Sequence, residues 1–342
     1  MQLSKQRGKW RDCQLFCVGI ILWGLLRHQL FGLRRLTASN IKIGTWKSPL
    51  PLSQTNWVKT QLEKKNPGLA VEVVVIKTRG DKIPDAPLSK AGSKSLFVKE
   101  IEDALLQGDI DLAVHSMKDM PAEIPKGLYI GAVPIRKIAN DVFISKEKLH
   151  FSELKPGACI GANGQARMAQ LLFKRPDIKI VRLQGDLDTR LRTLETEDLD
   201  GIILAAAGIL KMNMGMRITE YLDETFMLPA VGQGALCIET RDNDYKVLPF
   251  VTKLDERDTR SVIMGERAFS RRLGGGCQVP LAALGKIEKN TFSITGIVAD
   301  PDGKKIIKET MSGSRDLSET IGEKLGDILL CMGAKQILDN LK

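Results

Sequence analysis

Short apolar runs that alternate with helix-length segments constrain the fold of this chain more than any other feature. From residue 41 onward, strand-like runs such as Val71–Ile76 and Ile110–Val114 alternate with helical segments near 53–65 and 97–106. Strands that alternate with helices predict βαβ units and a largely parallel sheet. The pattern recurs over 139–230, so we expect an α/β fold with two such sheets.

The order of these elements predicts three domains after a leader, as a length of 342 residues allows. Domain 1 is expected at 41–135 with 235–252, because the Gly-rich run 229–234 is typical of a crossing back. Domain 2 is expected at 139–230, and a small α+β domain 3 at 256–342. Two doubly wound α/β domains joined by two crossings predict a hinged, ligand-holding cleft like that of periplasmic binding proteins.

The leader, residues 1–40, differs in composition from the rest of the chain. It holds seven basic residues and one acidic residue, so six of the ten net positive charges lie in it. Its apolar run Leu15–Leu26 is shorter than the roughly 17–25 residues of a spanning helix. A signal-like segment, an organelle transit peptide and a start codon assigned too far upstream remain open. We expect membrane contact only if this leader is retained.

Composition limits the classes of partner. Aromatic residues make up 5% of the chain and no basic stripe stands out, which argues against a nucleic-acid partner. The modest positive charge of the body suits a small polyanion. The six cysteines are scattered without zinc-site spacing, so we expect no metal and a reducing compartment. The predicted location is the cytoplasm, or an organelle if the leader is a transit peptide.

The segment His115–Pro121 places Lys118 and Asp119 side by side directly after the strand at 110–114. Ligands of open α/β sheets bind at the carboxyl ends of strands. A solvated ion pair in a loop is the alternative, because charged pairs at such positions are common and mostly inert. These residues alone leave both interpretations open.

Three motifs, His115–Pro121, Gly232–Ala235 and Gly275–Pro280, together resemble the porphobilinogen deaminase (hydroxymethylbilane synthase) family. The resemblance extends over nearly all of 41–342. It implies a monomeric transferase of porphyrin and haem biosynthesis that joins four porphobilinogen units, with loss of ammonia, into a linear tetrapyrrole. It also implies that the growing chain is carried by a dipyrromethane cofactor, bound as a thioether to Cys277.

The resemblance assigns roles to individual residues. Asp119 is the implied catalytic carboxylate, which stabilises positive charge on the pyrroles, and Lys118 the implied ligand of a substrate carboxylate. Cys277 is the implied thiolate nucleophile. The other residues implied to hold the cofactor are Ser48, Ser116, Asp81, Lys90, Arg167, Thr189 and Arg190. Weaker candidates for substrate contact are Lys47, Lys94, Phe97, Gln184 and Lys211. Capping and ordinary surface polarity are the alternative for the polar members of these sets.

The chain departs from the family pattern at carboxylate-binding arginines, which are replaced by Trp46, Asn140, Gln184 and Lys211. The segment 161–167 also lacks one arginine and two serines of the pattern. Each lost arginine removes charge-assisted hydrogen bonds worth about 1.5–3 kcal/mol. One interpretation is an enzyme, of normal or reduced activity, whose pocket uses lysines instead. The other is an impaired paralogue that binds small anions without catalysis. The intact Lys118–Asp119 pair favours the enzyme.

Overall fold

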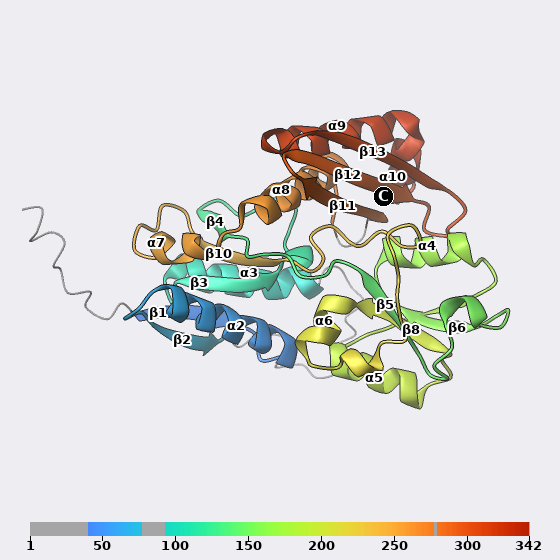
Figure 1. Ribbon diagram of the computed structural model, residues 1–342, viewed down its shortest axis with the longest axis horizontal. Coiled ribbons are helices and arrows are strands. Elements are labelled where there is room, and N and C mark those ends of the chain that lie inside the picture. Colours follow the sequence, from blue (N-terminus) through green and yellow to red (C-terminus); the bar gives the residue numbers. More distant parts are fainter. Residues whose placement is uncertain (1–39, 77–92, 277–278, 342) are drawn as a thin grey trace, which may run out of the picture.

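Three sheets form the framework of the structure, a computed structural model that describes residues 40–76, 93–276 and 279–341. The first two sheets have five strands each and the third has three. In Figure 1 the first sheet (blue to cyan, with one later strand) and the second (green to yellow) lie below the third, which is orange to red. The predicted fold class, two α/β lobes with a small α+β unit, is confirmed.

The first sheet combines parallel and antiparallel pairs. Its strands are β1 (Asn40–Thr45), β2 (Ala70–Val75), β3 (Leu112–Ser116), β4 (Leu128–Ala132) and β10 (Leu236–Arg241). Their order is β2-β1-β3-β10-β4. β1 runs parallel to β2 and β3, whereas β10 runs antiparallel to β3 and β4. The late strand β10 therefore completes a sheet that begins about 200 residues earlier in the chain.

Two helices cover opposite faces of the first sheet, α2 (Pro49–Lys65) and α3 (Ser93–Gln107). Successive side chains of a strand point to opposite faces. Accordingly, Leu112 of β3 packs in one cluster with Leu62 of α2, and the neighbouring Ala113 packs in another with Leu105 of α3. The sheet is thus buried on both faces, as the apolar run at 110–114 requires.

The second sheet repeats this arrangement. Its strands are β5 (Asp141–Ser145), β6 (Cys159–Ala162), β7 (Lys179–Arg182), β8 (Gly201–Ala205) and β9 (Glu220–Tyr221), in the order β7-β6-β8-β5-β9. β6 is parallel to β7 and β8, and β5 is antiparallel to β8 and β9. Its faces are covered by α4 (Gln165–Lys174) and α5 (Leu187–Thr196), and α6 (Ala206–Lys211) follows β8.

The prediction of largely parallel sheets is wrong, because half of the pairings in each five-stranded sheet are antiparallel. Sequence reasoning also missed β4, β9 and α6, which are all short. Local apolar patterns do not report strand direction; direction is set by how the chain re-enters each sheet from the crossings. The predicted domain limits stay a prediction.

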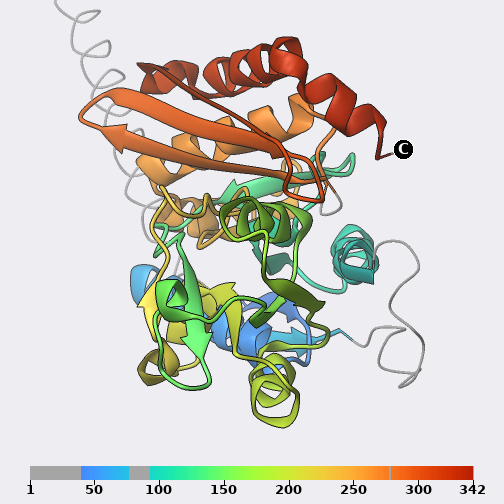
Figure 2. The same cartoon turned by 90° about the vertical axis from the view of Figure 1, so that its right-hand side faces the viewer.

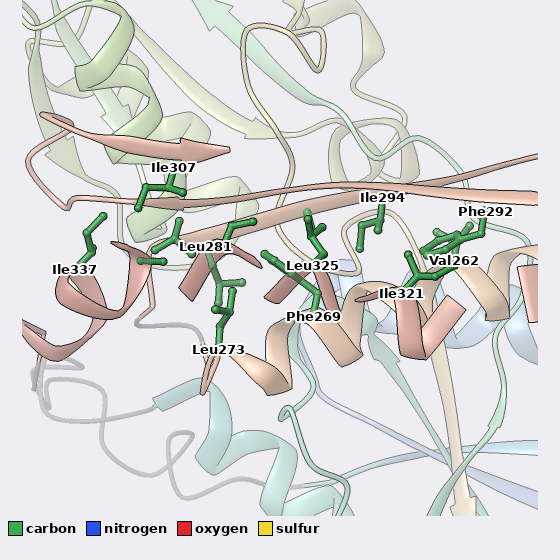
Figure 3. Close-up of a cluster of buried hydrophobic side chains, with 14 residues drawn as sticks. Val262, Phe269, Leu273, Leu281, Phe292, Ile294, Ile307, Ile321, Leu325 and Ile337 are labelled. Atoms are coloured by element: carbon green, nitrogen blue, oxygen red, sulfur yellow. The ribbon is translucent and has the colours of Figure 1, made fainter. Parts of the chain in front are cut away.

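The third sheet is an antiparallel meander packed beneath helices. Its strands are β11 (Leu281–Glu288), β12 (Thr291–Ala299) and β13 (Ile306–Ser314). The helices are α8 (Arg257–Arg272), α9 (Ser318–Leu329) and α10 (Lys335–Asp339), and α7 (Leu248–Val251) precedes them. Figure 3 shows the buried side chains of this layer, with Phe269 of α8 and Leu325 of α9 facing Ile294 of β12. None of the helices in the described ranges is long and apolar enough to cross a membrane.

Loops at the carboxyl ends of parallel strands lie where the first two sheets approach each other. β1 leads into residues 46–48 ahead of α2, and β3 leads into the short 3-10 turn Met117–Asp119. In the second sheet β6 leads into residues 163–164 and β7 into residues 183–186. Such ends are where ligands bind in open α/β sheets. The topology therefore brings four loops to one place.

Two chain crossings connect the first and second sheets, at about 133–140 and 227–235. Arg136 Nε donates to the Gln233 carbonyl at 2.8 Å, and the Lys137 N–H donates to the Gly234 carbonyl at 3.3 Å. Gly234 has φ +83°, and a Cβ there would lie 2.2 Å from the Ile138 carbonyl oxygen. Only glycine allows the two crossings to approach so closely.

Helices α8 and α9 touch through glycines, which yields a stability prediction. A Cβ on Gly322 would lie 2.1 Å from the Gly265 carbonyl oxygen. Gly322→Ala should destabilise the protein by about 1–3 kcal/mol through overpacking. Lys324→Ala, an exposed position in the same helix, is the control and should change stability by less than about 0.5 kcal/mol. Equal thermal midpoints by circular dichroism for both variants would contradict this packing.

A buried cluster of ionisable side chains lies between β3, β10 and α3. His115 Nε2 lies 3.0 Å from Glu239 Oε2, and both side chains are almost fully buried. Glu102 is also buried, and its Oε1 has no hydrogen-bond partner within the described part of the chain. Burial, and then repulsion from Glu239, raise the pKa of Glu102 to about 7, although His115 opposes the shift. Glu102 therefore holds a proton in the folded protein at pH values where an exposed glutamate is ionised.

Glu102→Gln should reduce the dependence of stability on pH. The pKa of this carboxyl rises from 4.5 to about 7 on folding, so the folded state binds more protons than the unfolded state between these values. Its contribution to stability is therefore present at low pH and is lost as the pH rises through 7, roughly 3 kcal/mol in all. Urea unfolding at pH 5 and pH 8 should show a smaller difference for this variant than for wild type. The exposed control Glu123→Gln should behave as wild type; identical pH dependence in all three proteins would refute the assignment.

Candidate active site

A cavity of about 1310 Å³ lies between the loops of the first two sheets and the segment that joins α8 to β11. The first sheet contributes residues 46–51 and 116–120, and the second contributes 163–168 and 182–188. Gly275 and Gly276 line it from the third side. The cavity is large enough for several linked small rings, since ligand pockets commonly measure about 300–1,000 Å³.

The wall from the first sheet carries Ser116, Lys118 and Asp119, all half-buried. Ser116 is the last residue of β3, and the turn at 117–119 that follows directs Lys118 and Asp119 to the cavity. Gln54 of α2 exchanges hydrogen bonds with the Ser116 hydroxyl at 3.1 and 3.3 Å. Sequence reasoning missed Gln54, because it is a single polar residue inside a helix and only the fold brings it to Ser116.

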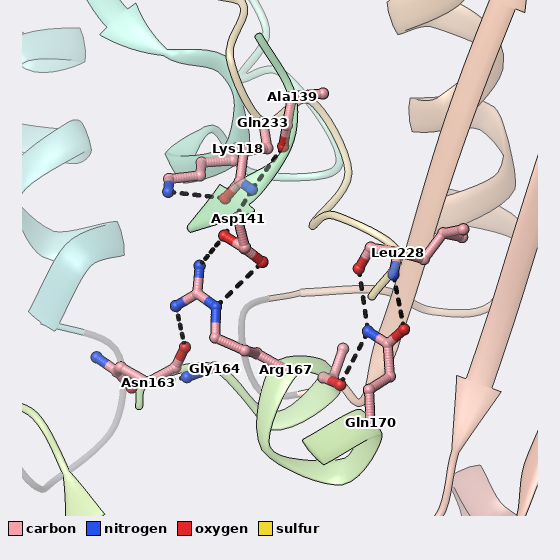
Figure 4. Close-up of polar contacts among 10 residues, drawn as sticks. Lys118, Ala139, Asp141, Asn163, Gly164, Arg167, Gln170, Leu228 and Gln233 are labelled. Atoms are coloured by element: carbon pink, nitrogen blue, oxygen red, sulfur yellow. Dashed lines mark hydrogen bonds and ion pairs between the residues drawn. The ribbon is translucent and has the colours of Figure 1, made fainter. Parts of the chain in front are cut away.

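The wall from the second sheet is built on a buried ion pair, drawn in Figure 4. Arg167 Nη2 lies 2.7 Å from Asp141 Oδ1, and Arg167 Nε lies 3.2 Å from Asp141 Oδ2. Arg167 Nη1 also donates to the Asn163 carbonyl at 2.7 Å. Asp141 starts β5 and is 2% exposed. Bidentate pairing of this kind fixes the guanidinium plane at the edge of the cavity.

Arg190 adds a second cation to this wall. Its Nε donates to the Gly185 carbonyl at 3.0 Å. Burial, and then the nearby charge of Arg167, lower the pKa of Arg190, whereas Asp119 and Asp186 act in the opposite direction. The guanidinium stays charged because its ordinary pKa lies far above neutrality. The two arginines and the carboxylate of Asp119 therefore share one electrostatic environment across the cavity.

Two lysines face the cavity: Lys137, on the first crossing, and Lys211, at the end of α6. Lys211 Nζ lies 5.7 Å from the centre of the Trp57 ring, within the range of a cation–π contact. Burial, and then repulsion from Lys137, lower the pKa of Lys211. A group whose cationic form is disfavoured in this way gains from an anionic ligand placed between the two ammonium groups.

Helix N-termini add to the positive character of the cavity. α2 and α4 begin at residues that line it and have no side-chain cap, whereas α5 is capped by the Asp186 carboxylate. The first N–H groups of a helix have no partner within the helix, and the helix dipole favours negative charge there. With the arginines and lysines, these ends make the cavity suited to carboxylate groups.

Most of the site residues predicted from the sequence that the structure describes line this one cavity. Those that do are Lys47, Ser48, Ser116, Lys118, Asp119, Arg167, Gln184, Arg190 and Lys211. Thr189 does not; its N–H donates to Asp186 at the start of α5. Asp81, Lys90 and Cys277 lie outside the described residues, as do the side chains of Lys94 and Phe97 at the start of α3.

The positions that depart from the arginine pattern are used in different ways. Trp46 and Gln184 line the cavity, whereas Asn140 Nδ2 donates to the Leu222 carbonyl at 3.0 Å and supports a loop. Asp141 was missed as a functional residue. An aspartate that opens a buried strand requires a partner, and that signal was available from the sequence. Among the described residues, no group of three or more histidines, cysteines, aspartates and glutamates is placed to hold a metal ion.

Comparison with known proteins gives a consistent result. The family model for the porphobilinogen deaminase dipyrromethane cofactor binding domain matches residues 41–249, and the model for the C-terminal domain of that enzyme matches 261–330. Porphobilinogen deaminase of Syntrophotalea carbinolica is 48% identical over 89% of this chain and 96% of its own length. The enzyme of Bacillus subtilis is 47% identical over 88% and 96%.

A solved structure of the methionine-binding protein MetQ aligns with 63% of this chain and 88% of its own, with a TM-score of 0.40 and 17% identity. The two family models include the segments that line the cavity. The chain therefore belongs to the porphobilinogen deaminase family.

Proposed function

We propose that this chain is a hydroxymethylbilane synthase, which joins four porphobilinogen units with loss of ammonia into a linear tetrapyrrole for porphyrin and haem biosynthesis. The observation that carries the proposal is one large cavity in which the Asp119 carboxylate faces a wall of cations, in a chain of the porphobilinogen deaminase family. Porphobilinogen carries two carboxylates, so the lengthening product is a polyanion that the cationic wall attracts.

The cavity fits a dipyrromethane, which carries acetate and propionate groups. Arg167 and Arg190 present guanidinium groups on one side, and Gly276 leaves open space, since a Cβ there would meet no atom of the described residues within 4 Å, apart from its chain neighbours. When bound, this group supplies the nucleophilic pyrrole carbon to which the next unit is joined. Ser48, Ser116 and Thr189 are further proposed ligands of its carboxylates or of the loops around it, and Asp81 and Lys90 are proposed from the resemblance alone.

Asp119 is the proposed catalytic residue. Loss of ammonia leaves positive charge on the substrate pyrrole and makes its N–H more acidic. A half-buried carboxylate beside that N–H accepts the hydrogen bond and stabilises the charge as it develops. The neighbouring Lys118 holds a substrate carboxylate and so fixes the ring relative to Asp119. Lys47, Lys94, Phe97, Gln184 and Lys211 are further proposed contacts of the substrate.

We further propose that the protein works as a monomer in the cytoplasm, with the domain limits predicted from the sequence and with a hinge at the two crossings. Scattered cysteines support a reducing compartment. An organelle is the alternative if residues 1–40 act as a transit peptide, and membrane contact requires that this leader be retained.

Asp119→Asn should lower kcat for porphobilinogen consumption by about 100-fold or more, because the amide keeps the size but loses the charge that stabilises the cationic intermediate. The thermal midpoint should be nearly unchanged. The control is Asp109→Asn, an exposed aspartate at the start of the same loop-strand unit and outside the cavity. Steady-state ammonia release measures the effect, and a kcat within a factor of two of wild type would refute the role of Asp119.

Cys277 is the proposed attachment point of the cofactor, and mass spectrometry tests it directly. Wild type made in a host that produces porphobilinogen should be heavier than its sequence by one dipyrromethane, and Cys277→Ser should lack the added mass. Cys331→Ser, which removes an exposed free thiol, should keep it. The attachment would be disproved by an unmodified wild type or by an adduct that survives in Cys277→Ser.

A further inference from the structure

Gln233 is a buried polar residue on the second crossing that none of the roles above uses. Its side chain is fully buried, with 0% exposure, and it reaches three polar partners. Lys118 Nζ donates to its Oε1 at 3.2 Å, while its Nε2 donates to the Ala139 carbonyl and to Asp141 Oδ1, both at 2.8 Å. Figure 4 shows Gln233 between Lys118 and Asp141.

The orientation of the Gln233 amide follows from the chemistry of its partners. A carbonyl and a carboxylate can only accept hydrogen bonds, so the NH₂ group must face Ala139 and Asp141. The ammonium of Lys118 can only donate, so the amide oxygen must face it. A flipped amide would lose all three interactions at once. The side chain therefore has one stable orientation.

The backbone of Gln233 is held as firmly as its side chain. Its carbonyl accepts from Arg136 Nε at 2.8 Å, and its N–H donates to the Ala230 carbonyl at 2.9 Å. The preceding Gly232 N–H donates to the buried Glu266 carboxylate at 2.7 Å. Gln233 is thus held firmly enough to fix the position of the flexible Lys118 side chain.

The neutral amide also separates two charges that have different partners. Asp141 is bound on its far side by Arg167 in a bidentate pair. Gln233 contributes a hydrogen bond to this carboxylate without adding charge, and at the same time it offers Lys118 only a neutral acceptor. A neutral acceptor orients an ammonium without neutralising its charge.

We propose that Gln233 is a positioning residue, whose amide aims the ammonium of Lys118 into the cavity and ties it to the Asp141–Arg167 pair on the opposite wall. The inference rests on the proposed function, in which Lys118 binds a substrate carboxylate. Hydrogen bonds through Gln233 and Asp141 then connect Lys118, beside the first sheet, to Arg167, beside the second. Gln233 thereby influences how substrate is held through its hydrogen bond to Lys118.

Gln233→Met tests the proposal, with Gln170→Met as a matched control. Gln170 is also a buried glutamine with three hydrogen bonds, to the Ala166 carbonyl and to both backbone groups of Leu228, and it does not contact Lys118. Both variants should lose similar thermal stability. Only Gln233→Met should raise KM for porphobilinogen, by about tenfold, with a smaller change in kcat. An unchanged KM in Gln233→Met, or the same rise in both variants, would overturn the proposal.

A double-mutant cycle with Lys118→Met shows whether Gln233 acts through Lys118. If it does, adding Gln233→Met to Lys118→Met should leave KM and kcat within about twofold of the single Lys118 variant. A further tenfold rise would mean that Gln233 acts by another route. If Lys118→Met alone leaves KM unchanged, the proposed role of Lys118 fails instead, so the two failures are distinguishable.

If Gln233→Met does not fold, Gln233→Glu is the second test of the proposal, because glutamate has nearly the same shape as glutamine. The introduced carboxylate would pair with Lys118 and would lie against Asp141, because Gln233 contacts both side chains. We expect KM to rise by about tenfold or more at pH 8, since the paired ammonium no longer attracts substrate. A KM equal to that of wild type at pH 8 would overturn the proposal.

Discussion

The buried carboxylate of Glu266 is the interaction on which the arrangement of the three sheets depends. It is fully buried on α8 and accepts from Arg136 Nη1 at 2.6 Å, from the Gly232 N–H at 2.7 Å and from the Gly285 N–H at 2.8 Å. These donors come from the first crossing, the second crossing and β11. A buried charge is costly unless it is paired and hydrogen-bonded, so all three partners must stay in place. The third sheet is thereby held against the hinge of the other two.

The segments that meet at Glu266 also place polar and charged side chains at the cavity. The same crossings present Gln233 and Lys137 to the cavity, and Asp141, next after the first crossing, fixes Arg167. The Asp119 carboxylate faces Arg190 and Arg167 of the opposite wall, in a site enclosed on three sides. The surroundings of these groups are less polar than water, so the electrostatic interactions between them are stronger than they would be in water. A polyanionic chain can be held by the wall while positive charge develops beside Asp119.

Much of the fold could be predicted from the sequence because apolar periodicity is a local property. The predicted runs Val71–Ile76 and Ile110–Val114 overlap the observed strands β2 and β3, each with its start and end shifted by one or two residues. Strand direction was not predictable, since β10 and β5 pair antiparallel only after the crossings have reversed the chain. The motif His115–Pro121 indicated Lys118 and Asp119, which meet in one cavity with Arg167. Gln54 carries no local signal of a site, and its contact with Ser116 joins residues 62 positions apart. Gln233 lies in the motif Gly232–Ala235, but its partner Lys118 is 115 residues away and could not be inferred from the sequence.

The measurement that tests the central claim most directly is the stoichiometry of turnover by the purified full-length protein. With porphobilinogen as the only substrate, the proposed synthase should release four molecules of ammonia for each linear tetrapyrrole formed, over many turnovers. Trp46 and Gln184 stand where the family pattern has carboxylate-binding arginines. They would then lower the rate of turnover without changing this ratio. Porphobilinogen that binds tightly with no release of ammonia would contradict the account and would identify a non-catalytic binding protein.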